Sequence, residues 1–419
     1  MIFKFKILNI FKKPLLLFFT LLVLSEMYLP SYKTNFLLQL LFLVFTIKVK
    51  KIKISTSFYK QILPLVLIFG IGFIGLFLNT YELSFVLKDI IYFLKPIIAI
   101  AIGYIVFYKN QELEVFVKSI FYIGVLSASI HLVGVLFFSN FFKSSISEIR
   151  GDFGLDSFIE IFGFYFLFYS KKWLGKRLIA DNTKYWVCIV VFLLSIFLYF
   201  SRTMLIGFLL GYLTIEGYTK ITGHLLKYIG VLILLVILFY TYLFSIKIHR
   251  NSNGIEAFLY KIKIAPEEIF KAKINRDNHK DLWDHWRAYE AKRAIILMNE
   301  HKESYILGCG YGSLVNLKFK APVGEEDMKY ISRLHNGYVF VFYKMGVFGF
   351  FLLLYFLIGL YSKTYNIETK NLKLLYNNKF ISFIGIFYLF SSLIISGIYI
   401  PRDTIIFILG GFLSFKNLC

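Results

Sequence analysis

Residues 333–361 read RLHNGYVFVFYKMGVFGFFLLLYFLIGLY, and this stretch decides the class of fold. It opens with an arginine, a histidine and an asparagine, and from Gly337 onward Lys344 is its one charged residue. A helix of about 20 apolar residues crosses the hydrocarbon core of a bilayer, which is roughly 30 Å thick. The stretch therefore predicts a membrane-spanning helix that begins beside a cluster of polar groups.

The rest of the chain repeats this pattern of long apolar runs separated by polar breaks. Of its 419 residues, 58% are hydrophobic and 17% are charged, whereas ordinary soluble domains are about 25% charged. The composition therefore excludes an ordinary soluble enzyme and predicts an all-α, polytopic membrane helix bundle of about twelve transmembrane helices. The twelve runs cover approximately residues 14–30, 35–48, 62–79, 89–108, 114–138, 153–169, 185–200, 203–218, 225–246, 337–361, 380–396 and 403–416.

One long polar segment interrupts these runs. Spans one to nine fall in residues 1–246, a long outer loop in residues 247–336, and spans ten to twelve in residues 337–419. Cytoplasmic loops of membrane proteins are enriched in lysine and arginine, and the short loops on the side of the N-terminus carry most of these residues here. We therefore expect both termini in the cytoplasm and the long loop in the periplasm.

The net charge of +22 separates into two populations on this topology. Lysine dominates the predicted cytoplasmic loops, where it sets the orientation, so the basic balance does not indicate a nucleic-acid partner. Eight of the nine arginines fall on the outer side. Because guanidinium groups bind phosphate through paired hydrogen bonds and stay charged, these arginines predict the handling of an anionic group. Pairing with carboxylates of the long loop is the alternative for each of them.

The long loop concentrates the polar chemistry, with five of the seven histidines. Its stretch from Asp281 to Glu300 has apolar residues at helical spacing and predicts one amphipathic helix that covers a cavity in the bundle. The three cysteines lie far apart without a CxxC pair, so we expect neither a disulfide framework nor a zinc site. Inside the spans, Lys95 is expected to point toward substrate or to pair with Glu160 or Asp89, and Lys344 to extend to an interface.

Several short motifs follow one another in a fixed order along the outer side. They are Arg150-Gly151-Asp152-Phe153-Gly154, Ser201-Arg202, Arg287, Gly308-Cys309-Gly310-Tyr311-Gly312, His335-Asn336-Gly337-Tyr338 and Gly346-Val347-Phe348-Gly349. In this order and on this side, they resemble the O-antigen polymerase and O-antigen ligase superfamily over approximately residues 145–360. The resemblance implies a GT-C-like, metal-independent membrane glycosyltransferase without a cofactor. Its substrate would be an oligosaccharide linked to undecaprenyl diphosphate, handled on the periplasmic side of the bacterial inner membrane.

This reaction needs cations and a base, and the motifs supply candidates for both. Arg202 and Arg287 are the expected clamp for the diphosphate, where negative charge develops. His335 is the expected base for the attacking sugar hydroxyl, although a hydrogen-bonded residue at the membrane interface is the alternative. The glycines let the backbone approach a sugar or phosphate, or form an ordinary turn, and Tyr338 is expected to stack on a sugar ring. The predicted substrate-binding residues are Arg150, Arg293, Lys95, Tyr338, Asn336, Gly308 and Gly310.

Three functions fit these features. The first is an O-antigen polymerase that transfers a glycan from undecaprenyl diphosphate to the terminal sugar of another lipid-linked repeat unit. The second is a ligase that transfers the glycan to lipid A core, and the third is a flippase for lipid-linked oligosaccharides, which would predict two repeated halves. Membrane lipid is an expected partner in each case, and a chain-length regulator is a further candidate partner of a polymerase.

Overall fold

The computed structural model describes residues 14–49, 55–108, 113–138, 158–249, 254–271, 273–275, 277–322, 327–365 and 371–415. Arg150 and the motif that it begins, residues 150–154, lie outside the described residues.

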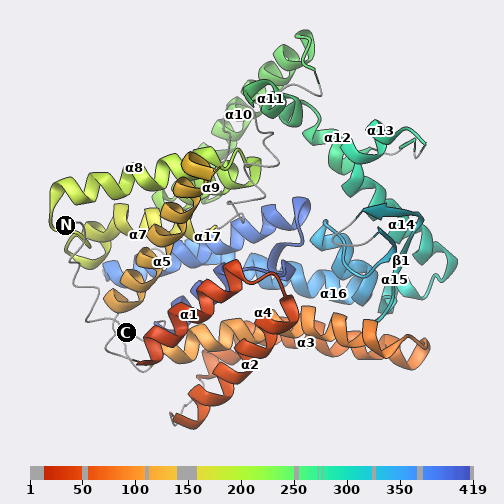
Figure 1. The fold of residues 1–419 in the computed structure, drawn as a ribbon, viewed down its shortest axis with the longest axis horizontal. Coiled ribbons are helices and arrows are strands. Elements are labelled where there is room, and N and C mark those ends of the chain that lie inside the picture. The colour runs from red at the N-terminus through yellow and green to blue at the C-terminus, as the bar shows by residue number, and fades with distance from the viewer. Residues whose placement is uncertain are drawn as a thin grey trace.

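Helices account for most of the described chain, and one of them lies on each predicted apolar run (Figure 1). The all-α bundle expected from the sequence is therefore confirmed. The helices before the long loop are α1 (Pro14–Tyr28), α2 (Tyr32–Val49), α3 (Thr56–Leu78), α4 (Leu83–Tyr108), α5 (Leu113–Val133), α7 (Ile159–Leu174), α8 (Asn182–Leu198), α9 (Arg202–Glu216) and α10 (Gly223–Ser245). Those after it are α16 (Gly337–Tyr361), α17 (Leu372–Ile394) and α18 (Ile405–Ser414).

Within the described residues, five helical segments are long and apolar enough to cross a membrane by length and composition. They lie on α3, α4, α5, α16 and α17, and shorter apolar helices accompany them. The chain is thus a multi-pass membrane protein, and the number of twelve spans stays a prediction.

Side-chain caps fix where the helices that bear the candidate residues begin. The hydroxyl of Ser201 accepts a hydrogen bond from the backbone N–H of Met204, and the side chain of Asn336 accepts one from Val339 at 3.0 Å. Such caps satisfy N–H groups that have no partner within the helix. As a result, Arg202 is the first residue of α9, and His335 lies directly before the cap of α16.

The long loop is folded, and Figure 1 shows its α14, α15 and β1 beside the ends of α3 and α16. Its helices are α11 (Gly254–Lys263), α12 (Ala265–Phe270), α13 (His279–Asp284), α14 (Trp286–Glu300) and α15 (Ser304–Leu307). An antiparallel hairpin of β1 (Val315–Pro322) and β2 (Asp327–Ile331) follows, which was not predicted from the sequence.

The prediction of one helix from Asp281 to Glu300 is wrong, because the chain breaks at His285 into α13 and α14. His285 has φ −119° and ψ 26°, outside the helical range. Its imidazole Nδ1 lies 2.7 Å from the carbonyl oxygen of Asp281, and its Nε2 lies 3.2 Å from the carboxylate of Glu267 on α12. The break therefore lets α13 and α14 take separate directions over the bundle.

Two buried ion pairs inside the bundle differ from the expected partners of their lysines. Lys95 on α4 pairs with Glu26 on α1, so the expected pairing with Glu160 or Asp89 is wrong. Lys344 on α16 is fully buried against Asp89 on α4, so its expected extension to an interface is also wrong. Pairing is what makes a buried charge tolerable in a low-dielectric interior.

Candidate functional site: an arginine and histidine cavity

A cavity of about 430 Å³ lies where the long loop meets the bundle. The residues that line it come from the start of α9, from α11 and α12, from the α13–α14 junction and from the residue before the cap of α16. Arg202, Arg287 and His335 are all among them, although 133 positions of sequence separate the first from the last. The structure therefore brings the three predicted catalytic residues to one cavity.

Arg202 reaches the cavity from the first turn of α9. Its Nη2 donates to both carboxylate oxygens of Glu268 at 3.0 Å, and its Nη1 donates to the carbonyl oxygen of Lys261. The helix dipole does not favour a cation at this end of a helix, so these oxygen partners offset an unfavourable position.

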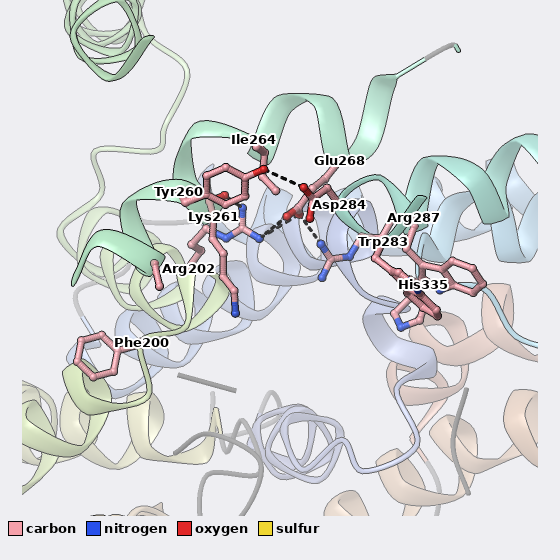
Figure 2. A pocket seen from close by; sticks show the side chains of 12 residues that line it. Phe200, Arg202, Tyr260, Lys261, Ile264, Glu268, Trp283, Asp284, Arg287 and His335 are labelled. Atoms are coloured by element: carbon pink, nitrogen blue, oxygen red, sulfur yellow. Dashed lines mark hydrogen bonds and ion pairs between the residues drawn. The ribbon is translucent and has the colours of Figure 1, made fainter. Parts of the chain in front are cut away.

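Arg287 reaches the same carboxylate from the first turn of α14. Its Nη1 donates to Oε2 of Glu268 at 2.5 Å. Figure 2 shows both guanidinium groups pointing from different helices toward Glu268. The Glu268 side chain is only 12% exposed, so two cations enclose one carboxylate between α9, α12 and α14.

Further polar and aromatic contacts connect α11, α12, α13 and α14, the loop helices that cover the cavity. The Tyr260 hydroxyl on α11 donates to the carboxylate of Asp284 at 2.8 Å, and the rings of Trp283 and Trp286 stack with centroids 4.8 Å apart. Behind them, the Lys271 ammonium donates to Asp281 at 2.7 Å, and this hydrogen bond lowers the pKa of Asp281 below its ordinary value. These hydrogen bonds and the stacked rings thus join α11, α12, α13 and α14 into one layer over the cavity.

His335 lies at the opposite side of the cavity from Arg202, where the chain turns into α16 (Figure 2). Its Nδ1 lies 2.8 Å and 3.0 Å from the two carboxylate oxygens of Glu290, and its backbone N–H donates to the same carboxylate at 3.0 Å. Glu290 is on α14, one turn after Arg287, so a single helix carries a cation of the cavity and the partner of the histidine.

Three of the predicted substrate-binding residues surround the site without lining the cavity. Arg293 donates through Nε to the carbonyl oxygen of Asn316 on β1 at 2.8 Å. Asn336 caps α16, and the Tyr338 hydroxyl donates to the carbonyl oxygen of Leu389 on α17 at 2.8 Å. Each therefore has a local structural contact, and their roles toward a substrate stay predictions.

Gly308 and Gly310 pack against helices of the bundle. Their φ angles are +75° and +77°, values that side chains other than glycine rarely adopt. A Cβ atom on Gly308 would lie 2.3 Å from the carbonyl oxygen of Lys344, and one on Gly310 would lie 2.6 Å from Cα of Gly75. In the structure these glycines thus let the loop backbone approach α16 and α3, while their predicted approach to a sugar or phosphate stays a prediction.

Glu268 and Glu290, the two carboxylates that hold the predicted catalytic residues, were not predicted from the sequence. Glu290 had a signal, because it follows Arg287 by three positions on a predicted helix and so shares its face. Glu268 had none, because the chain between it and Arg202 gives no indication of which acid meets which arginine. Lys95, the remaining predicted substrate-binding residue, lies on α4 and does not line the cavity.

The arrangement can bind an anion and accept a proton within one space. Two guanidinium groups that converge on one carboxylate present donors that suit a phosphate oxygen equally well. A histidine whose Nδ1 is engaged by a carboxylate keeps Nε2 as its proton acceptor. Within the described residues, no group of three or more His, Cys, Asp or Glu side chains is arranged to hold a metal ion.

Comparison with known proteins adds one match. Residues 187–354 match the family model described as O-antigen ligase, and this region runs from α8 into α16. It contains Arg202, Arg287 and His335, and the resemblance expected from the motifs is thereby confirmed. The searches of curated proteins and of solved structures find no match to the chain.

Proposed function

Because the chain carries an O-antigen ligase family domain at residues 187–354, we propose that it is an O-antigen polymerase. In this proposal it transfers a glycan from undecaprenyl diphosphate to the terminal sugar of another lipid-linked repeat unit, at the periplasmic face of the inner membrane. The observation that carries the proposal is the common cavity of Arg202, Arg287 and His335.

The proposed transfer needs positive charge where the donor breaks. As the bond between the sugar and the diphosphate breaks, the electron pair stays on the diphosphate, and fixed cations stabilise that charge. Arg202 and Arg287 are held by two helices and already converge on an oxyanion, the Glu268 carboxylate. The substrate diphosphate takes the place of this carboxylate, so no large rearrangement of the arginines is required.

The acceptor hydroxyl loses its proton during the transfer, and His335 is the proposed base. The residue lines the same cavity as the arginines, and its side chain is 42% exposed, so a hydroxyl can reach it. An imidazole is suited to this role because it exchanges protons near neutral pH. The clamp and the base are thus available to one bound pair of substrates.

A ligase that transfers the finished glycan to lipid A core is the second candidate, because the matching family model is described as O-antigen ligase. Donor, leaving group and cavity are the same for both reactions, and the two differ only in the acceptor. The lysine-, asparagine-, isoleucine- and phenylalanine-rich composition is typical of chains encoded in serotype-specific polysaccharide loci, and it favours the polymerase. A flippase is less well supported, because the three residues line one cavity between the long loop and the start of α9 rather than a central path.

The test is turnover by the purified chain in liposomes that contain lipid-linked repeat units. We expect glycan chains of several repeats and release of undecaprenyl diphosphate. Arg287→Ala should lower the rate at least about 100-fold, because a fixed donor to the developing oxyanion contributes about that much. Lys292→Ala, an exposed change on the same helix, is the matched control and should leave the rate unchanged. Wild-type turnover by Arg287→Ala would refute the clamp.

A further inference from the structure

The partner of His335 is a carboxylate that is almost completely buried. Glu290 is 1% exposed, whereas the histidine side chain is 42% exposed. Both carboxylate oxygens lie within 3.0 Å of the imidazole Nδ1, and one of them also accepts from the backbone N–H of His335. The carboxylate thus contacts the Nδ1 edge of the ring, and the exposed part of the ring lines the cavity.

These contacts decide which ring nitrogen carries the proton. An ionised carboxylate can only accept, so Nδ1 must be the donor, and the lone pair of the neutral imidazole is then on Nε2. Rotating the ring by half a turn would break the contacts of Nδ1 with both oxygens. Because the same carboxylate also holds the backbone N–H, and Asn336 caps the next helix, the ring and its backbone are fixed together.

Charged groups around this pair come from several elements. Glu290 interacts electrostatically with Arg333, the residue two positions before His335, in addition to the imidazole itself. On the cavity side of His335 lie the side chains of Arg202, Lys261, Glu268, Asp284 and Arg287. Of these groups, Glu290 is the one whose carboxylate contacts the ring directly, so its removal changes the charge at the ring most strongly.

We propose that Glu290 is the positioning residue of the base: it holds His335 in the Nδ1–H tautomer and stabilises the imidazolium that forms during transfer. This inference rests on the proposed function. In the step, the acceptor O–H bond breaks and its proton goes to Nε2, while the oxygen bonds to the anomeric carbon of the donor. The bond from that carbon to the diphosphate breaks, and its electron pair leaves with the diphosphate. Glu290 stays ionised throughout.

The first experiment measures transfer against pH for three variants in liposomes. Glu290→Gln removes the charge but keeps an oxygen acceptor, and we expect kcat to fall about 100-fold with KM within about threefold of wild type. The acidic limb of its pH–rate profile should move to lower pH, because the imidazolium loses its neighbouring negative charge. Glu290→Asp should restore part of both effects. Glu300→Gln, an exposed change at the end of the same helix, should behave as wild type.

The second experiment does not depend on glycan transfer. Diethyl pyrocarbonate modifies neutral imidazole, so peptide mass spectrometry across pH gives the titration midpoint of His335. We expect the midpoint of Glu290→Gln to lie below that of wild type, and that of Glu300→Gln to match it. An unchanged midpoint in Glu290→Gln would overturn the inference, even if transfer is lost. If the midpoint shifts in Glu290→Gln but the wild-type chain itself transfers no glycan, the proposed function alone would be refuted.

Discussion

At the residue scale, the site is organised by two carboxylates. Glu290 engages the histidine, and Glu268 joins the arginines of α9 and α14. Each is poorly exposed, so each has a strong electrostatic effect on the group that it contacts. The Glu268 carboxylate occupies the position that the proposal gives to the diphosphate, which makes it an internal competitor of the substrate.

Competition by Glu268 predicts an effect on substrate binding. Glu268→Gln replaces ion pairs with Arg202 and Arg287 by weaker hydrogen bonds from the guanidinium groups to a neutral amide oxygen, so the arginines are easier to engage. We expect KM for the lipid-linked donor to fall about tenfold, which corresponds to about 1.4 kcal/mol. Inhibition by undecaprenyl diphosphate should become tighter by a similar factor, because the product meets the same competitor. Kinetics in liposomes with and without added product measure both effects.

Glu267→Gln is the matched control for this prediction. Glu267 is the preceding residue on α12 and contacts His285 and Lys271 rather than either arginine. It should leave KM and product inhibition unchanged. A higher KM in Glu268→Gln would contradict the proposed competition between Glu268 and the substrate. It would show instead that Glu268 positions the two arginines for substrate binding.

At the element scale, a kink in α16 connects the bundle to the glycine-rich loop. Gly346 has φ +63° and ψ −163° in the middle of the helix. A Cβ atom there would lie 2.2 Å from the carbonyl oxygen of Ile306 and 2.6 Å from the backbone nitrogen of Gly308. The kink therefore allows α15 and the loop after it to pack directly against α16.

Gly346→Ala should destabilise the protein, because alanine is strained at this φ and its Cβ meets backbone atoms. We expect a loss of at least about 2 kcal/mol, measured as a lower apparent Tm in detergent. Gly359→Ala is the control in the same helix, since nothing lies within 4 Å of its Cβ position. That variant should keep the wild-type Tm or raise it. Equal Tm values for both variants would contradict the role given to the kink.

The elements were predictable from the sequence to different degrees. The apolar runs marked the long helices, because a bilayer demands long apolar helices whatever their partners are. The hairpin was missed although residues 315–321 alternate between buried and more exposed side chains, since a short strand in a polar loop gives a weak pattern. The break at His285 was missed because it depends on a contact with Glu267, which helical periodicity does not report.

Partners of charged residues were the least predictable feature of the site. The motifs indicated Arg202, Arg287 and His335 as the reacting groups, and the fold brings them to one cavity. Their carboxylate partners depend on how the loop folds over the bundle, and an ion pair between distant positions has no sequence period. Lys95 shows the same limit, because its partner Glu26 lies 69 positions away on another helix.

At the scale of the whole molecule, a membrane bundle supports one folded loop (Figure 1), and residues of this loop line the cavity together with the start of α9. This architecture suits the proposed reaction on substrates with lipid anchors, because the bundle supplies apolar helices while the loop supplies the polar groups. The charge separation found in the sequence corresponds to it: lysines predict the orientation, and arginines from the loop and from α9 meet in the cavity.

Arginine chemistry at this cavity predicts transfer without a divalent ion. Turnover of lipid-linked repeat units in liposomes should be unchanged after the addition of EDTA, because guanidinium groups rather than a metal neutralise the diphosphate. Glycan length on a gel, with and without chelator, measures this. Loss of activity that Mg²⁺ or Mn²⁺ restores would contradict the prediction.

The most direct test of the central claim is a lipopolysaccharide gel of a strain that lacks this chain, complemented with wild type or with Arg287→Ala. We expect lipid A core with a single repeat unit in the deletion strain and in the Arg287→Ala strain. Wild type should restore the ladder of long chains. Bare core would identify a ligase, and a full ladder without the chain would contradict its role in assembling the glycan.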